Sequence, residues 1–221
     1  MFEEYKDDFD KLIEEGLLLL GWQDSVRLTT EDRFLVHPIC ENAIDHKNKN
    51  TLTPELIDEL SLKAYEIIYF QVVGKRERAD YISLVYYNSE NFRPLLNLID
   101  ESTICFYRGY FTAALSLSFI ILERYLRSVF NWSPGDRDHT FYRLKQSILT
   151  LPNEEAARTA YDIINVIYSR YEALEPTQFE FNRHGLLHGV RGPTEYDEMN
   201  CARIYQLFNL LCTAENIDRT G

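Results

Sequence analysis

The sequence predicts an all-α fold. Apolar residues recur every three or four positions along most of the chain, which is the spacing of one face of a helix. The 221 residues include only seven prolines and nine glycines, too few for a chain rich in strands and turns. Hydrophobic residues make up 45% of the chain and aromatic residues 14%, so there is enough apolar surface for a packed core.

The N-terminal part predicts a helix followed by a loop region. Phe9 and Ile13 belong to an apolar series with helical spacing, and Gly21 is expected to end that helix. Residues 22–52 are mixed and polar, and they contain Pro38. We therefore expect a loop region with short elements there.

A long helix is expected next. Thr53 is a suitable N-cap, and Pro54 would occupy the first helical position. The helix should end at Gly74 and the charged run Lys75–Arg78, which is interpreted as a solvated helix end. A shorter element is expected over residues 79–88.

The rest of the chain predicts a bundle of about five helices. Phe111–Phe130 is strongly apolar and is expected to be the central helix. A last helix should follow Pro193, with Thr194 as its N-cap. We expect an N-terminal helical accessory segment at residues 1–87 and a helical bundle at residues 88–221. The other helices of this bundle are predicted over residues 91–107, 139–150 and 154–172.

Composition and charge exclude several classes of protein. The net charge of −12 argues against broad non-specific binding to nucleic acid. No apolar run approaches the roughly 18 residues that a membrane-spanning helix needs, and the acidic N-terminus does not resemble a signal peptide. The four cysteines are scattered without a C-x-x-C pair, which predicts a cytoplasmic protein without disulfides or zinc.

The stretch NRHGLLHG at residues 182–189 contains the candidate catalytic residues. Arg183 is a permanent cation suited to phosphate oxygens, and His188 can accept or donate a proton near neutral pH. From Phe181 to Pro193 there are two arginines, two histidines and no acid, so the stretch is locally basic in an acidic chain. Cleavage of an RNA phosphodiester requires such a pairing of cation and proton carrier.

Arg-x4-His with a polar residue after the arginine resembles the signature of the HEPN superfamily, whose catalytic members are metal-independent ribonucleases. The resemblance covers residues from about 90 to 215. The string GYFTAALSLSFIILERYLR resembles an earlier helix of such domains, and NRHGLLHG with a final amphipathic helix is similar to abortive-infection and ApeA-like HEPN proteins. HEPN toxins silenced by tyrosine modification carry Tyr two residues after the histidine. Val190 stands there in this chain, so that control is not expected.

The resemblance implies a HEPN-like bundle acting as a metal-independent endoribonuclease without a cofactor, in a toxin or antiviral-defence setting. Arg183 and His188 would be catalytic, and Asn182 and His184 would orient them. Glu123, late in the apolar helix, would be a further auxiliary acid. The expected partners are RNA, a second copy in a homodimer, and a protein that inhibits or triggers the activity. On an ideal helix the two catalytic side chains would point about 140° apart, so a composite dimer site is expected.

Other interpretations stay open. Glu180, His184 and His188 are spaced four apart and could share one helix face as ligands of a divalent metal. Arg183 could instead form a surface ion pair with Glu180, and Glu123 could pair with Arg127 at i+4. The whole protein could also be a non-catalytic HEPN-like module that binds a partner protein or RNA.

Overall fold

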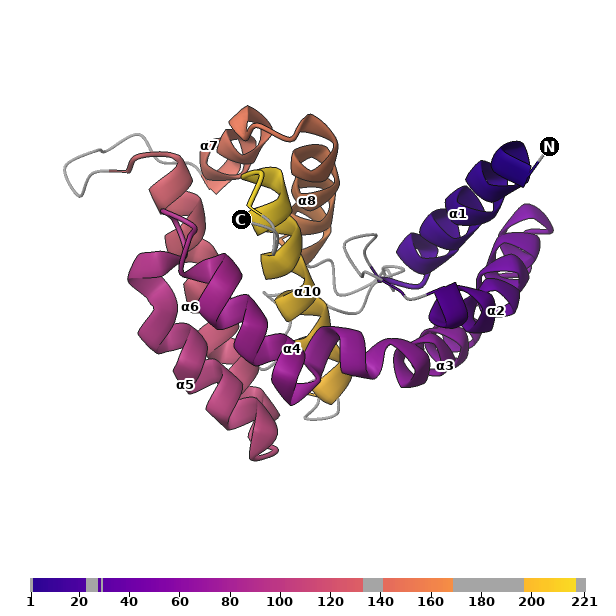
Figure 1. The fold of residues 1–221 in the computed structure, drawn as a ribbon, viewed down its shortest axis with the longest axis horizontal. Helices are drawn as coiled ribbons and strands as arrows, with labels where there is room; N and C mark the ends of the chain where they lie inside the picture. The colour runs from indigo at the N-terminus through magenta and orange to yellow at the C-terminus, as the bar shows by residue number, and fades with distance from the viewer. Residues whose placement is uncertain (1, 23–27, 29, 133–140, 169–196, 218–221) are drawn as a thin grey trace, which may run out of the picture. The chain divides into compact units, whose positions relative to one another are not determined.

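The computed structural model describes residues 2–22, 28, 30–132, 141–168 and 197–217 (Figure 1). Every regular element within these ranges is a helix, which confirms the prediction of an all-α fold. None of the helices described is long and apolar enough to cross a membrane.

The chain divides into two compact units, Met1–Glu77 and Arg78–Gly221. The expected boundary was ten residues later, after residue 87. The difference arises because residues 78–87 have the last helix of the chain as a packing partner. Tyr86, for example, hydrogen-bonds to Asn209, 123 positions away.

The first unit contains three helices, which are α1 (Phe2–Leu19), α2 (Thr30–Asn48) and α3 (Pro54–Val73). The first two come into very close contact where Gly16 faces Cys40. A Cβ atom on Gly16 would lie 2.3 Å from the Cβ of Cys40, so only glycine permits this approach.

The structure corrects the prediction for residues 22–52, because most of this range is the helix α2. Its buried residues Val36, Cys40 and Ala43 are spaced four and three apart, which is a helical stripe. Pro38 lies inside this helix and lacks an N–H group, which usually costs about 3 kcal/mol or more. Burial of the stripe offsets that cost.

The predicted start of α3 is confirmed. Thr53 has extended backbone angles, and its hydroxyl accepts a hydrogen bond from the Leu56 amide, with Pro54 at the start of the helix. Farther along, Ser61 donates to the carbonyl of Leu20, and the indole of Trp22 donates to the carbonyl of Ser61. These two bonds attach the end of α1 to the middle of α3.

The second unit is built from short and long helices. It begins within α4, which is followed by a π-helix and a 3-10 turn, and α5 and α6 then form a hairpin around Gly109, whose φ is +75°. In chain order the elements are α4 (Lys75–Asp80), η1 (Tyr81–Tyr86), η2 (Arg93–Leu95), α5 (Leu96–Tyr107), α6 (Phe111–Val129), α7 (Phe141–Gln146), η3 (Ser147–Thr150), α8 (Glu154–Ile167) and α10 (Glu198–Ala214).

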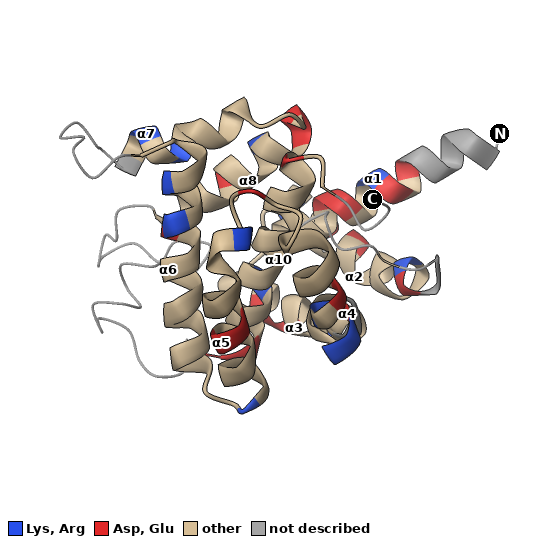
Figure 2. Ribbon diagram, turned by 60° about the vertical axis from the view of Figure 1, so that its left-hand side comes forward, with Lys and Arg blue, Asp and Glu red and all other residues tan. Residues whose placement is uncertain are grey.

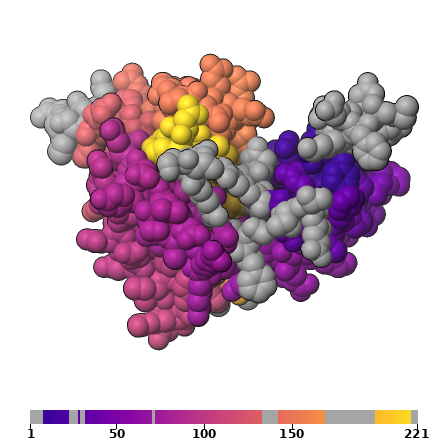
Figure 3. Space-filling model, in the orientation of Figure 1, coloured from indigo at the N-terminus to yellow at the C-terminus, as the bar shows by residue number. Residues whose placement is uncertain are grey.

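The central helix of this unit is α10, not α6 as the apolar composition of Phe111–Phe130 predicts. Thirteen of its seventeen residues are buried, so it is covered on all sides. The C-terminal end of α10 is visible in yellow in the space-filling view (Figure 3). The helix α6 keeps an outer face, on which Ile120 is 46% exposed. Its charged residues are confined to its C-terminal third (Figure 2).

The start of α10 also differs from the prediction. Its N-cap is Asp197 rather than Thr194, and the Asp197 carboxylate accepts a hydrogen bond of 2.7 Å from the Asn200 amide. An aspartate at this position also interacts favourably with the positive end of the helix dipole.

Candidate functional site

Four of the five predicted site residues lie outside the described residues. They fall in the segment 169–196, as does Glu180 of the alternative metal triplet. These four are Asn182, Arg183, His184 and His188. The structure does describe the two helices that this segment joins.

The helices α8 and α10, which flank the segment 169–196 in the chain, are packed side by side. The amide of Asn153, just before α8, donates to the carbonyl of Ala214 at the end of α10, so the two packed helices are antiparallel. The last residues of α8 therefore lie beside the first turns of α10. Ile167 and Tyr168 are buried there, so the C-terminal end of α8 is packed within the bundle.

Glu123 is described, and it lies near the opposite end of the bundle. The thiol of Cys201 approaches the carbonyl of Phe111 at 3.5 Å, and Tyr125 bonds to Glu215, so α6 and α10 are parallel. Glu123 is half-buried and lies about 18 Å along α6 from its first residue, at 1.5 Å per residue. Arg127, its possible partner, lies over the ring of Trp132 at 5.1 Å.

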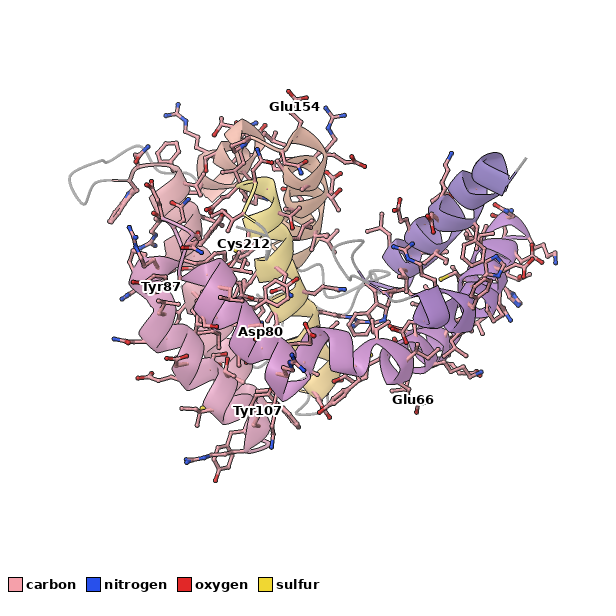
Figure 4. The ribbon with its side chains drawn as sticks, in the orientation of Figure 1. Glu66, Asp80, Tyr87, Tyr107, Glu154 and Cys212 are labelled. Carbon is pink, nitrogen blue, oxygen red and sulfur yellow. The ribbon has the colours of Figure 1, made fainter. Side chains whose placement is uncertain are left out.

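A set of polar groups lies along α10 and continues to the residue that follows it. We call this set the polar face of α10, and it consists of the buried Tyr205, Asn209 and Cys212 and the half-buried Glu215, which follow helical spacing. Cys212 is labelled on this helix in Figure 4. Tyr205 shares a hydrogen bond of 2.9 Å with Ser102 of α5, so α5 also contacts the polar face.

Arg78 lies against the polar face and is 1% exposed. Its Nη1 donates to the hydroxyl of Tyr86 at 2.9 Å, and that hydroxyl donates in turn to Oδ1 of Asn209. The guanidinium carbon lies 4.2 Å from the ring centroid of Tyr205, within cation–π range. These contacts fix one end and one face of the guanidinium.

The other two nitrogens of Arg78, Nε and Nη2, are buried without a hydrogen-bond partner among the described residues. No carboxylate within the described ranges forms a salt bridge with Arg78 either. Burial acts to lower the pKa of Arg78, but the phenol groups of Tyr86, Tyr205 and Tyr107 act in the other direction and leave that pKa raised. The guanidinium therefore stays charged in the core.

Glu215 closes the C-terminal end of the polar face. Its carboxylate accepts hydrogen bonds from Tyr125 at 2.6 Å, from Ser89 at 2.8 Å and from Asn91 at 3.0 Å. Three neutral donors therefore satisfy this carboxylate. The same Ser89 hydroxyl also accepts from the amide of Phe92, which ties the turn before α5 to the end of α10.

The thiol of Cys212 and the phenol of Tyr205 stay protonated in the polar face. Burial raises the pKa of Cys212 well above its usual value, and nearby Glu215 raises it further. Burial likewise raises the pKa of Tyr205 to about 12. Across the described ranges, no three or more His, Cys, Asp or Glu side chains are grouped so that they could hold a metal ion.

Sequence analysis missed Arg78, because it ends a charged run that was interpreted as solvated. One signal was available, since Arg78, Tyr81 and Val85 are spaced three and four apart and are all buried. That spacing extends an apolar stripe back onto the arginine. A buried cation breaks the usual pattern, in which arginine is almost never fully buried unless it is paired.

Neither a family model nor a curated protein nor a solved structure matches this chain.

Proposed function

We propose that the protein is a metal-independent endoribonuclease of the HEPN type. The observation that carries the proposal is the stretch NRHGLLHG, with Arg183 and His188 in a basic stretch of an acidic chain. The all-α fold is compatible with it. The proposed setting is the cytoplasm, in a toxin or antiviral-defence system with an inhibiting or triggering protein.

The proposed reaction uses a nucleophile that RNA itself supplies. The 2′-oxygen attacks the adjacent phosphorus while the bond from phosphorus to the 5′-oxygen breaks, giving a 2′,3′-cyclic phosphate and a 5′-hydroxyl. His188 takes the proton from the 2′-hydroxyl or gives one to the leaving 5′-oxygen. Arg183 stabilises the charge that develops on the phosphoryl oxygens. Asn182 and His184 orient these groups.

A homodimer is part of the proposal. Arg183 and His188 are five residues apart, and on an ideal helix their side chains would point about 140° from each other. Two copies related by a two-fold axis bring an arginine and a histidine from different chains to one phosphate. They also supply two His188 side chains, one for each proton transfer.

A second candidate is a non-catalytic helical module that binds a partner protein or RNA. The net charge of −12 favours it, because an acidic surface repels RNA unless binding is confined to a small basic spot. This candidate predicts an RNA-inert wild type with an intact fold.

The test is cleavage of a short RNA by the wild-type protein, with and without EDTA. We expect cleavage in EDTA with a 2′,3′-cyclic phosphate or its 3′-phosphate product, and no cleavage of RNA with a 2′-deoxy sugar at the cut site. Loss of cleavage in EDTA with rescue by a divalent ion would support the Glu180, His184 and His188 metal site instead. No cleavage under either condition would support the module.

The matched control is Arg191→Ala, which removes the other arginine of the basic stretch. We expect this variant to keep most of the activity, while Arg183→Ala loses it. Equal losses in both variants would mean that only local positive charge matters. That outcome would contradict a specific role for Arg183.

A further inference from the structure

The Nε–Nη2 edge of Arg78 has the donor arrangement of an oxyanion site. In a guanidinium group, Nε and Nη2 carry parallel N–H bonds that can hold two oxygens of one carboxylate or phosphate. These two nitrogens are the ones without a partner among the described residues. The remaining nitrogen, Nη1, is already bound to Tyr86.

The edge is held in place before any ligand arrives. The Tyr86 hydroxyl and Asn209 fix one end of the guanidinium, and the ring of Tyr205 lies against its face. Because the Arg78 guanidinium is already ordered, little side-chain entropy would be lost when an oxyanion binds.

An unpaired charge in the core is also expensive. Burial of a guanidinium is unfavourable unless an opposite charge and hydrogen bonds compensate for its lost hydration. Tyr86 and the cation–π contact with Tyr205 compensate in part, but they supply no negative charge. An oxyanion at the Nε–Nη2 edge would supply that charge and satisfy both remaining donors.

We propose that the Nε–Nη2 edge of Arg78 binds a small oxyanion, a phosphate or a carboxylate, between η1 and the polar face of α10. Arg78 is almost fully enclosed, so the ligand enters when the α4–η1 segment opens locally. That segment contains the π-helix η1, and π-helical turns are frequent at functional sites. Binding would tie residues 78–86 more firmly to α10.

The test follows the Nε–H resonance of Arg78 by NMR in the full-length wild-type protein, assigned by its loss in Arg78→Lys. Inorganic phosphate, acetate, and sodium chloride at matched ionic strength are titrated separately. We expect a saturating downfield shift with phosphate or acetate and none with chloride. The arm that saturates at lower concentration identifies the preferred oxyanion.

Thermal unfolding supplies the second readout. Phosphate or acetate should raise the melting temperature of the wild type with increasing concentration, as expected for a ligand of the folded state. Arg78→Lys keeps the charge but loses the fork, so that increase should disappear. Arg124→Lys, which changes an exposed arginine of α6, should retain it. No anion-dependent shift of the Arg78 resonance in the wild type would overturn the proposal, whatever the stability of the variants.

Discussion

At the scale of single residues, Tyr86 connects the two ends of the second unit. It accepts a hydrogen bond from Arg78 and donates one to Asn209, and all three side chains are buried. A hydroxyl in this position satisfies an acceptor on one side and a donor on the other. No apolar side chain can do both.

Tyr86→Phe should therefore be strongly destabilising although it removes a single oxygen. It leaves Nη1 of Arg78 and Oδ1 of Asn209 buried without this partner, and an unsatisfied buried group costs about 1–3 kcal/mol. Urea unfolding of the two proteins measures the difference. Tyr87→Phe, at a neighbouring exposed position, is the control and should be nearly neutral. Equal effects of the two changes would contradict the bridging role.

The buried thiol of Cys40 predicts a pH dependence. Burial raises its pKa from 9.0 to about 12, so between these values the folded thiol keeps its proton while the unfolded thiol loses it. The folded state then binds more protons, and the free energy of unfolding falls as pH rises above about 9. Unfolding curves from pH 7 to 10 should show this loss, and Cys40→Ala should reduce it. Cys105→Ala, at a half-exposed position, is the control.

At the scale of secondary-structure elements, the clearest anchor near the motif is the start of α10. Asp197 caps this helix directly after the segment that carries Arg183 and His188. The first turn of α10 follows that segment in the chain, and the end of α8 precedes it. The position of the start of α10 depends on the Asp197 cap, and that of the end of α8 depends on the burial of its last residues.

Asp197→Ala should loosen that turn. Loss of an N-cap side chain typically costs about 1 kcal/mol, and the Asn200 amide loses its acceptor. Hydrogen exchange at Asn200 should therefore become faster. Thr53→Ala removes the equivalent cap of α3 and should leave Asn200 unchanged. Unchanged exchange at Asn200 in the Asp197 variant would show that packing alone holds the start of α10.

Local sequence signals predicted correctly a helix that begins with a clear N-cap and proline. They failed where contacts with distant helices determine the structure. Thr53 and Pro54 predicted the start of α3 correctly, because a cap and its helix lie within four residues. The helix α2 was missed, because Pro38 normally breaks helices and only burial against neighbouring helices overrides it. The spacing of Arg78 with Tyr81 and Val85 was the one local signal of its burial, but the contact with Tyr205 of α10, more than 120 residues away, could not be predicted from it. The roles of Arg183 and His188 stay predictions.

At the scale of the whole molecule, long-range hydrogen bonds agree with a division between Glu77 and Arg78. Tyr86 hydrogen-bonds directly to Asn209 of α10, and Arg78 is connected to Asn209 through Tyr86. Ser89 hydrogen-bonds to Glu215, the residue that follows α10. The stretch before α5 therefore belongs to the C-terminal bundle. A boundary at residue 87 would separate Arg78 from Tyr205 and Tyr86 from Asn209.

Shortened chains test this division. A protein of residues 74–221 should unfold cooperatively, because it keeps the stretch that covers the polar face of α10. A protein of residues 88–221 should lose cooperative unfolding, since it lacks Arg78, Tyr81, Val85 and Tyr86, all of which are buried in the second unit. Circular dichroism during heating distinguishes the two. Equally cooperative unfolding of both chains would contradict the boundary at Arg78.

The central claim is that Arg183 and His188 cleave RNA, and the most direct test measures RNA cleavage and melting temperature together in three proteins. His188→Ala should lower the cleavage rate by roughly 10²–10⁴ with little change in melting temperature, the usual scale for a lost general acid or base. Arg183→Lys should also be impaired, because lysine keeps the charge but loses the planar fork. If both variants instead melt early and lose activity only in proportion to the unfolded fraction, the motif is structural and the ribonuclease proposal fails.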